Sequence, residues 1–169
     1  TLQVNYLAGA LLTALLLPLL RESARRRRDH TTRVVMVSSG AHKHAALHLD
    51  DLSLAQRYKG AYGQSKLAQV MFARSLQRVF DAEQLAALSV SCTPGFARTA
   101  IFANALRERP ASPALLWTLL QPLVWVVGRS ANMGAQTVLH CALSPDVRGG
   151  AYYSNCTERP VAGKDKVAA

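Results

Sequence analysis

The sequence predicts an α/β protein with a parallel sheet, because two strand-like runs flank a helix-like run. Residues 33–37 form a β-branched run that ends at two serines and a glycine, a pattern typical of a buried parallel strand. Residues 88–92 form a second strand-like run that ends before Pro94-Gly95. Between the two, apolar residues recur at helical spacing from Leu67 to Phe80. In such folds the carboxyl ends of the strands present the ligand-binding residues.

An apolar run at residues 7–20 predicts a first helix, with Asn5 just before it and Pro18 inside it. The run is about 14 residues, roughly 21 Å as a helix, which is shorter than the roughly 30 Å hydrocarbon core of a membrane. Its basic residues follow the run, whereas those of a signal peptide precede it. We therefore expect a buried helix that packs against a sheet.

Composition limits the remaining possibilities. With 169 residues, 50% of them hydrophobic, the chain has the apolar content of one globular domain. The net charge of +10 comes largely from arginine and is densest at residues 25–28. We expect these arginines in a solvated loop after the first helix. Because no stacking aromatics lie near them, nucleic acid is not an expected partner, and anionic lipid is the more plausible one.

Tyr62 and Lys66 carry the strongest indication of chemistry. Residues four apart share one helical face, so the phenol and the ammonium project the same way. A nearby positive charge favours phenolate over phenol, which gives a group able to move a proton to or from an alcohol. The same spacing also occurs in ordinary surface pairs. The pair gains weight from Ser39 at the end of the first strand and from Asn5 upstream.

Taken in order, these features resemble the C-terminal half of the short-chain dehydrogenase/reductase (SDR) family, in its retinol dehydrogenase and X-linked dehydrogenase/reductase (polyprenol dehydrogenase) branch. The similarity runs from about residue 3 to about residue 160. It is carried by residues 5–7, 35–39, 47–52, 62–68, 94–99 and 134–137.

The resemblance implies the C-terminal part of a Rossmann-type doubly wound parallel sheet, with three strands and flanking helices. Residues 1–169 would form a single partial domain, with a substrate lid at about 100–130. The apolar run at 113–127, which contains Trp117 and Trp125, lies in this segment, and ordinary core packing is its alternative role. The Gly-rich turn that opens the family is absent from this sequence, so we expect a fragment without the dinucleotide-binding half. Isolated, this fragment should be inactive and poorly soluble.

The resemblance also implies a catalytic tetrad. Tyr62 would be the general acid/base, and Lys66 would assist it and hydrogen-bond the nicotinamide ribose. Ser39 would hold the substrate oxygen in preference to Ser38, because the family uses the last serine of the pair. Asn5 would anchor a water that relays protons to the lysine. The residues expected to line the nicotinamide site are Tyr62, Lys66, Pro94, Gly95 and Thr99.

The implied function is hydride transfer between NADP or NAD and an alcohol or carbonyl carbon of a small apolar substrate such as a retinoid, polyprenol or steroid. NADP is favoured by the resemblance, although the residues that would decide lie outside this chain. The alternative is a non-catalytic truncated isoform or interaction module. The family also implies a homodimer through the helices at residues 6–20 and 62–80, and an intracellular location, either cytoplasmic or at the endoplasmic-reticulum membrane.

Cysteine and histidine residues suggest no metal site. The three cysteines form no C-x-x-C motif and suit reduced core thiols. Three histidines lie close together but lack a cysteine or carboxylate ligand at matching spacing. These residues are Cys92, Cys141, Cys156, His42, His44 and His48.

Overall fold

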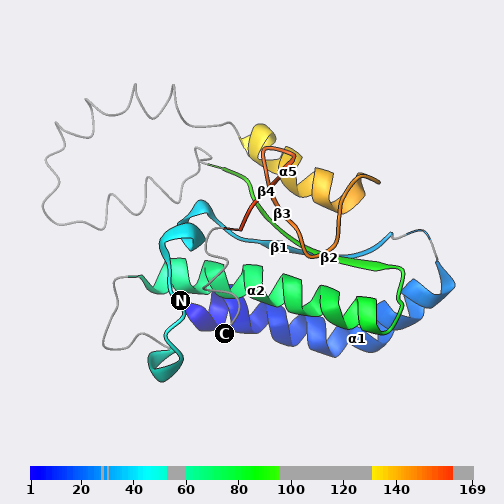
Figure 1. The fold of residues 1–169 in the computed structure, drawn as a ribbon, viewed down its shortest axis with the longest axis horizontal. Helices are drawn as coiled ribbons and strands as arrows, with labels where there is room; N and C mark the ends of the chain where they lie inside the picture. The colour runs from blue at the N-terminus through cyan, green and yellow to red at the C-terminus, as the bar shows by residue number, and fades with distance from the viewer. Residues whose placement is uncertain (28, 30, 53–59, 96–130, 162–169) are drawn as a thin grey trace, which may run out of the picture.

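The computed structural model describes residues 1–27, 29, 31–52, 60–95 and 131–161. A four-stranded sheet lies between two helical layers (Figure 1). Its order is β1 (Thr32–Val37), β2 (Ala87–Thr93), β3 (Tyr152–Ser154) and β4 (Thr157–Arg159). The first three strands are parallel, and β4 pairs with β3 in the antiparallel sense. The predicted α/β class with a parallel sheet is therefore confirmed.

Strand β4 is a fourth strand that the sequence did not predict. Its three residues are all exposed, so it carries no apolar run that could announce a strand. It forms because Asn155 and Cys156 adopt positive φ angles of 58° and 56°. Two consecutive left-handed residues are the requirement of a tight hairpin turn. This turn also exposes Cys156, whereas Cys92 and Cys141 are buried as expected, and all three thiols are free.

The helices divide between the two faces of the sheet. A π-helical turn, η1 (Gln3–Leu7), continues into α1 (Ala8–Arg26), and both α1 and α2 (Ala61–Ala82) cover one face, while α5 (Ala131–Leu143) covers the other (Figure 1). Two short 3₁₀ turns, η2 (Gly40–His44) and η3 (Leu49–Asp51), follow β1. This arrangement puts the ends of β1 and β2 beside the first turns of α2.

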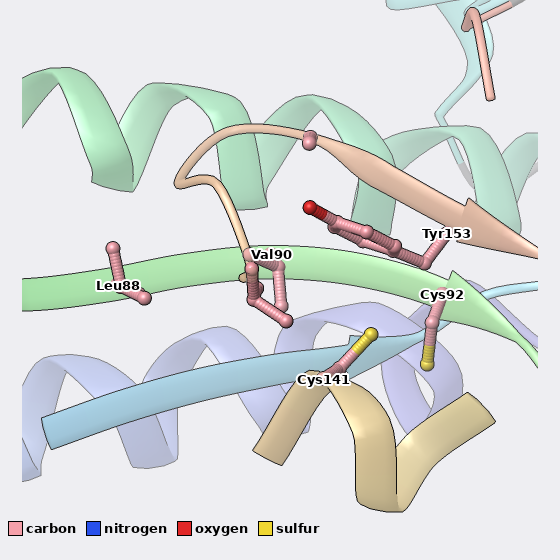
Figure 2. Packing of buried hydrophobic residues seen from close by; sticks show 7 residues of the cluster. Leu88, Val90, Cys92, Cys141 and Tyr153 are labelled. Atoms are coloured by element: carbon pink, nitrogen blue, oxygen red, sulfur yellow. The ribbon is translucent and has the colours of Figure 1, made fainter. Parts of the chain in front are cut away.

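Side chains of β2 point alternately to the two faces of the sheet and contribute to two apolar clusters. Leu88, Val90 and Cys92 face α5, where they pack with Cys141 and with Tyr153 of β3 (Figure 2). The intervening side chains face the other way, because successive strand residues point to opposite faces. The second cluster lies on the α1 and α2 side and contains Ala24, Leu76, Phe80, Leu85 and Ala87. The predicted helix at 67–80 is confirmed as part of α2, whose buried apolar residues recur every three or four positions.

The expectation of a fully buried first helix is wrong. Only Thr13 and Ala24 of α1 are buried, while Leu11, Leu15 and Leu19 are 61%, 71% and 65% exposed. The run is apolar around most of its circumference, and the sheet and α2 can cover only one stripe of it.

The first helix is also longer than its apolar run. Gln3–Arg26 forms one helix of 24 residues, long and apolar enough to cross a membrane by length and composition, a criterion that core helices of soluble proteins also meet. The helix therefore extends beyond the apolar run at residues 7–20 at both ends. Arg25 and Arg26 lie in its last turn rather than in a loop, where cations interact favourably with the helix dipole.

Candidate active site

Lys66 lies between the end of β1 and the side chain of Tyr62. Its Nζ donates to the carbonyl oxygen of Val37 at 2.9 Å and to Oε1 of Gln69 at 3.1 Å. The same nitrogen lies 5.6 Å from the centre of the Tyr62 ring. Burial lowers the pKa of Lys66 from its usual value of 10.5, because a low-dielectric surrounding disfavours the charged form. The predicted sharing of one helical face by these two residues is thus present.

Tyr62 occupies the first turn of α2, after Gly60. Its side chain is open to solvent, with the residue 51% exposed. Tyr62 does not itself line the cavity that opens at the ends of the parallel strands.

The two serines after β1 have different surroundings. Ser38 is buried, and its Oγ donates to the carbonyl oxygen of Lys66 at 2.8 Å, which joins the strand end to α2. The Oγ of Ser39 only accepts a hydrogen bond from the backbone nitrogen of Ala41 at 3.3 Å, at the start of η2. A hydroxyl can donate one hydrogen bond and accept two, so the described contacts leave the proton of Ser39 available to a ligand.

Asn5 lies within the π-helical turn η1 and reaches α2 through both its side chain and its backbone. Its Nδ2 donates to Oγ of Ser65 at 3.1 Å, and Ser65 donates to the carbonyl oxygen of Tyr62 at 2.8 Å. The carbonyl oxygen of Asn5 accepts from Nε2 of Gln69 at 2.6 Å. Asn5, Tyr62 and Lys66 therefore belong to one hydrogen-bonded network.

Sequence reasoning missed Ser65 and Gln69. Both are buried polar residues on the packed face of α2. Polar residues inside an otherwise apolar stripe were the signal that could have found them, since buried polar groups in proteins are normally hydrogen-bonded.

A polar cavity of about 280 Å³ opens at the carboxyl ends of the parallel strands, where α/β folds bind ligands. The predicted residues Ser39 and Gly95 line it, and Gly95 has a φ of 80°, a conformation that side chains disfavour. Pro94 precedes Gly95 and is partly buried. Thr99 and the lid segment at 100–130 lie outside the described residues. The other lining residues are Gly40, Lys43, Thr93, Tyr152 and Ser154.

Tyr152 is a buried member of this cavity that the sequence did not reveal. Burial raises the pKa of Tyr152 to about 12, so its phenol stays protonated at neutral pH. The ring of His42 packs edge-on against it, with 4.6 Å between centroids. The Nδ1 of His42 lies 2.7 Å from the carbonyl oxygen of Ser39. Because that carbonyl can only accept, the imidazole donates from Nδ1 and helps to fix the backbone at Ser39.

A second cavity, of about 580 Å³, lies between η1 and α2 and contains none of the predicted site residues. Its walls are mainly apolar and include Leu7, Leu49 and Phe72. It offers few groups for proton transfer, so the smaller polar cavity is the better candidate for chemistry.

Comparison with known proteins identified relatives over almost the whole chain. Dehydrogenase/reductase SDR family member 13 of Bos taurus is 39% identical, with 99% of this chain and 43% of the relative covered. Retinol dehydrogenase 12 of Mus musculus is 38% identical (90% and 44% covered), and polyprenol dehydrogenase of Homo sapiens is 35% identical (89% and 44% covered). The chain thus spans about half the length of the curated relatives it matches. No family model matches it.

Two solved structures share the fold. The carbonyl reductase Sniffer of D. melanogaster gives a TM-score of 0.61 at 18% identity, with 96% of this chain and 55% of that one covered. The NADPH-bound carbonyl reductase from chicken fatty liver gives 0.56 at 18% identity, with 89% and 51% covered.

Proposed function

Because the chain is homologous over almost its whole length to proteins of the short-chain dehydrogenase/reductase family, we propose that it forms the proton-handling half of an NAD(P)-dependent oxidoreductase. The observation that carries the proposal is the position of Lys66, whose ammonium lies between the carboxyl end of β1 and the ring of Tyr62. That is the place where a parallel α/β fold binds its ligand.

The proposed chemistry is a proton transfer at the oxygen of an alcohol or carbonyl substrate. Tyr62 donates or accepts this proton, and the nearby charge of Lys66 stabilises the phenolate. The hydroxyl of Ser39, on the wall of the polar cavity, donates a hydrogen bond to the same substrate oxygen. A bound nicotinamide supplies or accepts the hydride.

The described residues fit the nicotinamide end of such a cofactor. The cavity at the strand ends is polar, and Gly95 offers no side chain that could fill it. In this proposal Lys66 holds the ribose, and Pro94 and Gly95 line the nicotinamide site. Thr99, the remaining proposed contact of the nicotinamide, lies outside the described residues. The choice between NADP and NAD, with NADP favoured by the resemblance, and a lipid-like substrate are further parts of the proposal. The names of the relatives that act on retinol and polyprenol support that substrate class.

The test replaces Tyr62 by phenylalanine in the full-length protein. We expect turnover to fall by about 10²–10⁴-fold, with the cofactor dissociation constant changed by less than about twofold, because the ring is kept and only the proton donor is lost. Reduced nicotinamide absorbance measures turnover, and cofactor fluorescence measures binding.

Tyr6→Phe is the matched control. The ring of Tyr6 packs edge-on against Phe72, with 6.0 Å between ring centroids. Phenylalanine keeps this ring, so the Tyr6→Phe variant should retain wild-type turnover. Equal rates for Tyr62→Phe and wild type would refute the proposal.

A second candidate function is self-association through α1. Seven apolar side chains of η1 and α1 are more than two-fifths exposed, and exposed apolar patches of this kind mark interaction surfaces. We name this surface the leucine face. Its residues are Val4, Leu7, Leu11, Leu12, Leu15, Leu16 and Leu19. A second copy of the chain is its proposed occupant, in agreement with the dimer that the family resemblance implies.

Leu15→Asp tests this second candidate, because it puts a charge on the leucine face. We expect the variant to shift from dimer to monomer in analytical ultracentrifugation. Leu143→Asp is the control, since Leu143 is similarly exposed but lies on α5. A wild-type protein that is monomeric at all concentrations, yet sediments with anionic vesicles, would assign the face to lipid instead.

A further inference from the structure

Gln69 lies one turn after Lys66 on α2, and both ends of its amide are engaged. The residue is only 8% exposed. Its Oε1 accepts from Nζ of Lys66 at 3.1 Å, and its Nε2 donates to the carbonyl oxygen of Asn5 at 2.6 Å. One buried side chain therefore connects the lysine to a segment 64 residues earlier in the sequence.

The chemistry of the two partners fixes the orientation of the amide. An ammonium can only donate and a carbonyl oxygen can only accept. Turning the amide over would set its NH₂ against the ammonium and its oxygen against the carbonyl, which leaves both partners without their hydrogen bond to Gln69. Gln69 is thus held in one arrangement from both sides.

The partner of Nε2 lies in an unusual segment. Asn5 belongs to the π-helical turn η1, a form that is rare and occurs frequently at functional sites. The same turn directs the Asn5 side chain to Ser65. Gln69 and Ser65 together fasten η1 to the first turns of α2, where Tyr62 and Lys66 lie.

The described contacts use two of the three protons of the Lys66 ammonium. Val37 accepts one at the end of β1 and Gln69 accepts another. With two acceptors in fixed positions, the third N–H has a restricted direction and is left for a ligand beside Tyr62. Removing either acceptor would free the ammonium to rotate about its flexible stem.

We infer that Gln69 is a positioning residue for Lys66, which it holds in place through the carbonyl of Asn5. The inference rests on the proposed function for its catalytic consequence, but its effect on the lysine can be measured without turnover. The competing role for Gln69 is purely structural, in which the amide only joins η1 to α2.

The two roles differ in what they do to the charge of Lys66. Burial already lowers the pKa of Lys66, and an acceptor on the ammonium opposes that effect by favouring the charged form. Gln69→Leu should therefore lower this pKa further, by about one unit, which is a tenfold change in the ratio of charged to neutral lysine. Gln69→Glu should raise it, because a carboxylate replaces a neutral acceptor.

The experiment titrates Lys66 in the full-length protein by trace acylation with acetic anhydride at a series of pH values, read by mass spectrometry. Urea denaturation of each variant runs in parallel. Gln77→Leu is the matched control: Gln77 is also a buried glutamine of α2, but it accepts from the backbone nitrogen of Ser89 at 2.7 Å. It should lose stability without moving the Lys66 titration.

A lower Lys66 titration in Gln69→Leu supports the inference, because only an amide oxygen that acts on the ammonium itself is lost in this variant. The rise in Gln69→Glu checks that the method responds to charge at this position. Titration curves of both variants that superimpose on that of the wild type would overturn it. Should Gln69→Leu fail to fold, Gln69→Met, which also lacks the acceptor, takes its place.

Turnover separates this inference from the proposed function. We expect kcat of Gln69→Leu to fall by about tenfold at neutral pH, with substrate KM within about twofold. If the Gln69 variants shifted the Lys66 titration while the wild-type protein turned over no alcohol or carbonyl with NAD or NADP, the result would support the positioning role and refute the oxidoreductase proposal.

Discussion

Replacing Ser38 and Ser39 one at a time separates the structural from the catalytic serine. Ser38→Ala removes a buried hydrogen bond from Oγ to the carbonyl oxygen of Lys66, which is worth about 0.5–1.5 kcal/mol net. We therefore expect stability to fall by about 1 kcal/mol and turnover to stay within several-fold of wild type.

Ser39→Ala should lose little stability and much of the turnover. The hydroxyl of Ser39 makes one long bond of 3.3 Å to the nitrogen of Ala41, at the start of a five-residue turn. Its loss costs about 0.5 kcal/mol, at the lower end of the range for caps. The lost donor to the substrate oxygen should reduce kcat by about 10²–10³-fold, the range observed for removal of one oxyanion-hole donor.

Urea denaturation and initial rates on the same preparations of full-length protein make the comparison. The double variant should be within several-fold of the turnover of Ser39→Ala, because only one serine acts on the substrate. If Ser38→Ala lost its turnover and Ser39→Ala kept it, the assignment would be refuted and Ser38 would be the substrate-binding residue.

Two other predictions concern stability. In Gly149→Ala the new Cβ would lie 2.2 Å from Cδ of Gln77, whose amide cannot withdraw without breaking its bond to Ser89. We expect a loss of about 1–3 kcal/mol by urea denaturation, and a double variant with Gln77→Ala should lose less than the sum of the two; strict additivity would contradict the predicted clash. Burial lowers the pKa of His42 below 6.5, so the unfolded chain binds the proton first as pH falls. The contribution of His42 is complete above about pH 6.5 and is lost progressively below it; a His42→Gln variant should show a flatter stability profile between pH 7 and 5, and an equally steep profile would exclude His42 as the cause.

The sequence predicted what depends on local spacing. The helical period from Leu67 to Phe80 identified α2 because its buried side chains must follow the helix period. The same reasoning placed Tyr62 and Lys66 on one face, where the structure puts the ammonium 5.6 Å from the ring centre. The β-branched run before Ser38 likewise identified β1, because a strand covered by helices carries apolar residues at successive positions.

Local spacing could not predict contacts between distant segments. Nothing near Gln69 in the sequence indicates that its amide meets Asn5, since this contact depends on how η1 crosses α2. Strand β4 escaped prediction because its turn depends on left-handed Asn155 and Cys156, neither of which is a glycine. The exposure of α1 was missed for a related reason: apolar composition says that a helix favours burial, but not which neighbour covers it.

The leucine face and Asn5, one member of the catalytic network, lie on the same helix, which joins the two candidate functions. The π-helical turn that offers the Asn5 carbonyl to Gln69 ends at the exposed Leu7 and continues directly into α1, whose exposed leucines begin at Leu11. A second copy that covered this face would hold η1 more firmly against α2, and Lys66 with it. Leu15→Asp should therefore lower kcat as well as disperse the dimer, whereas Leu143→Asp should do neither. A monomeric Leu15→Asp protein with wild-type kcat would show that the position of Lys66 does not depend on what covers α1.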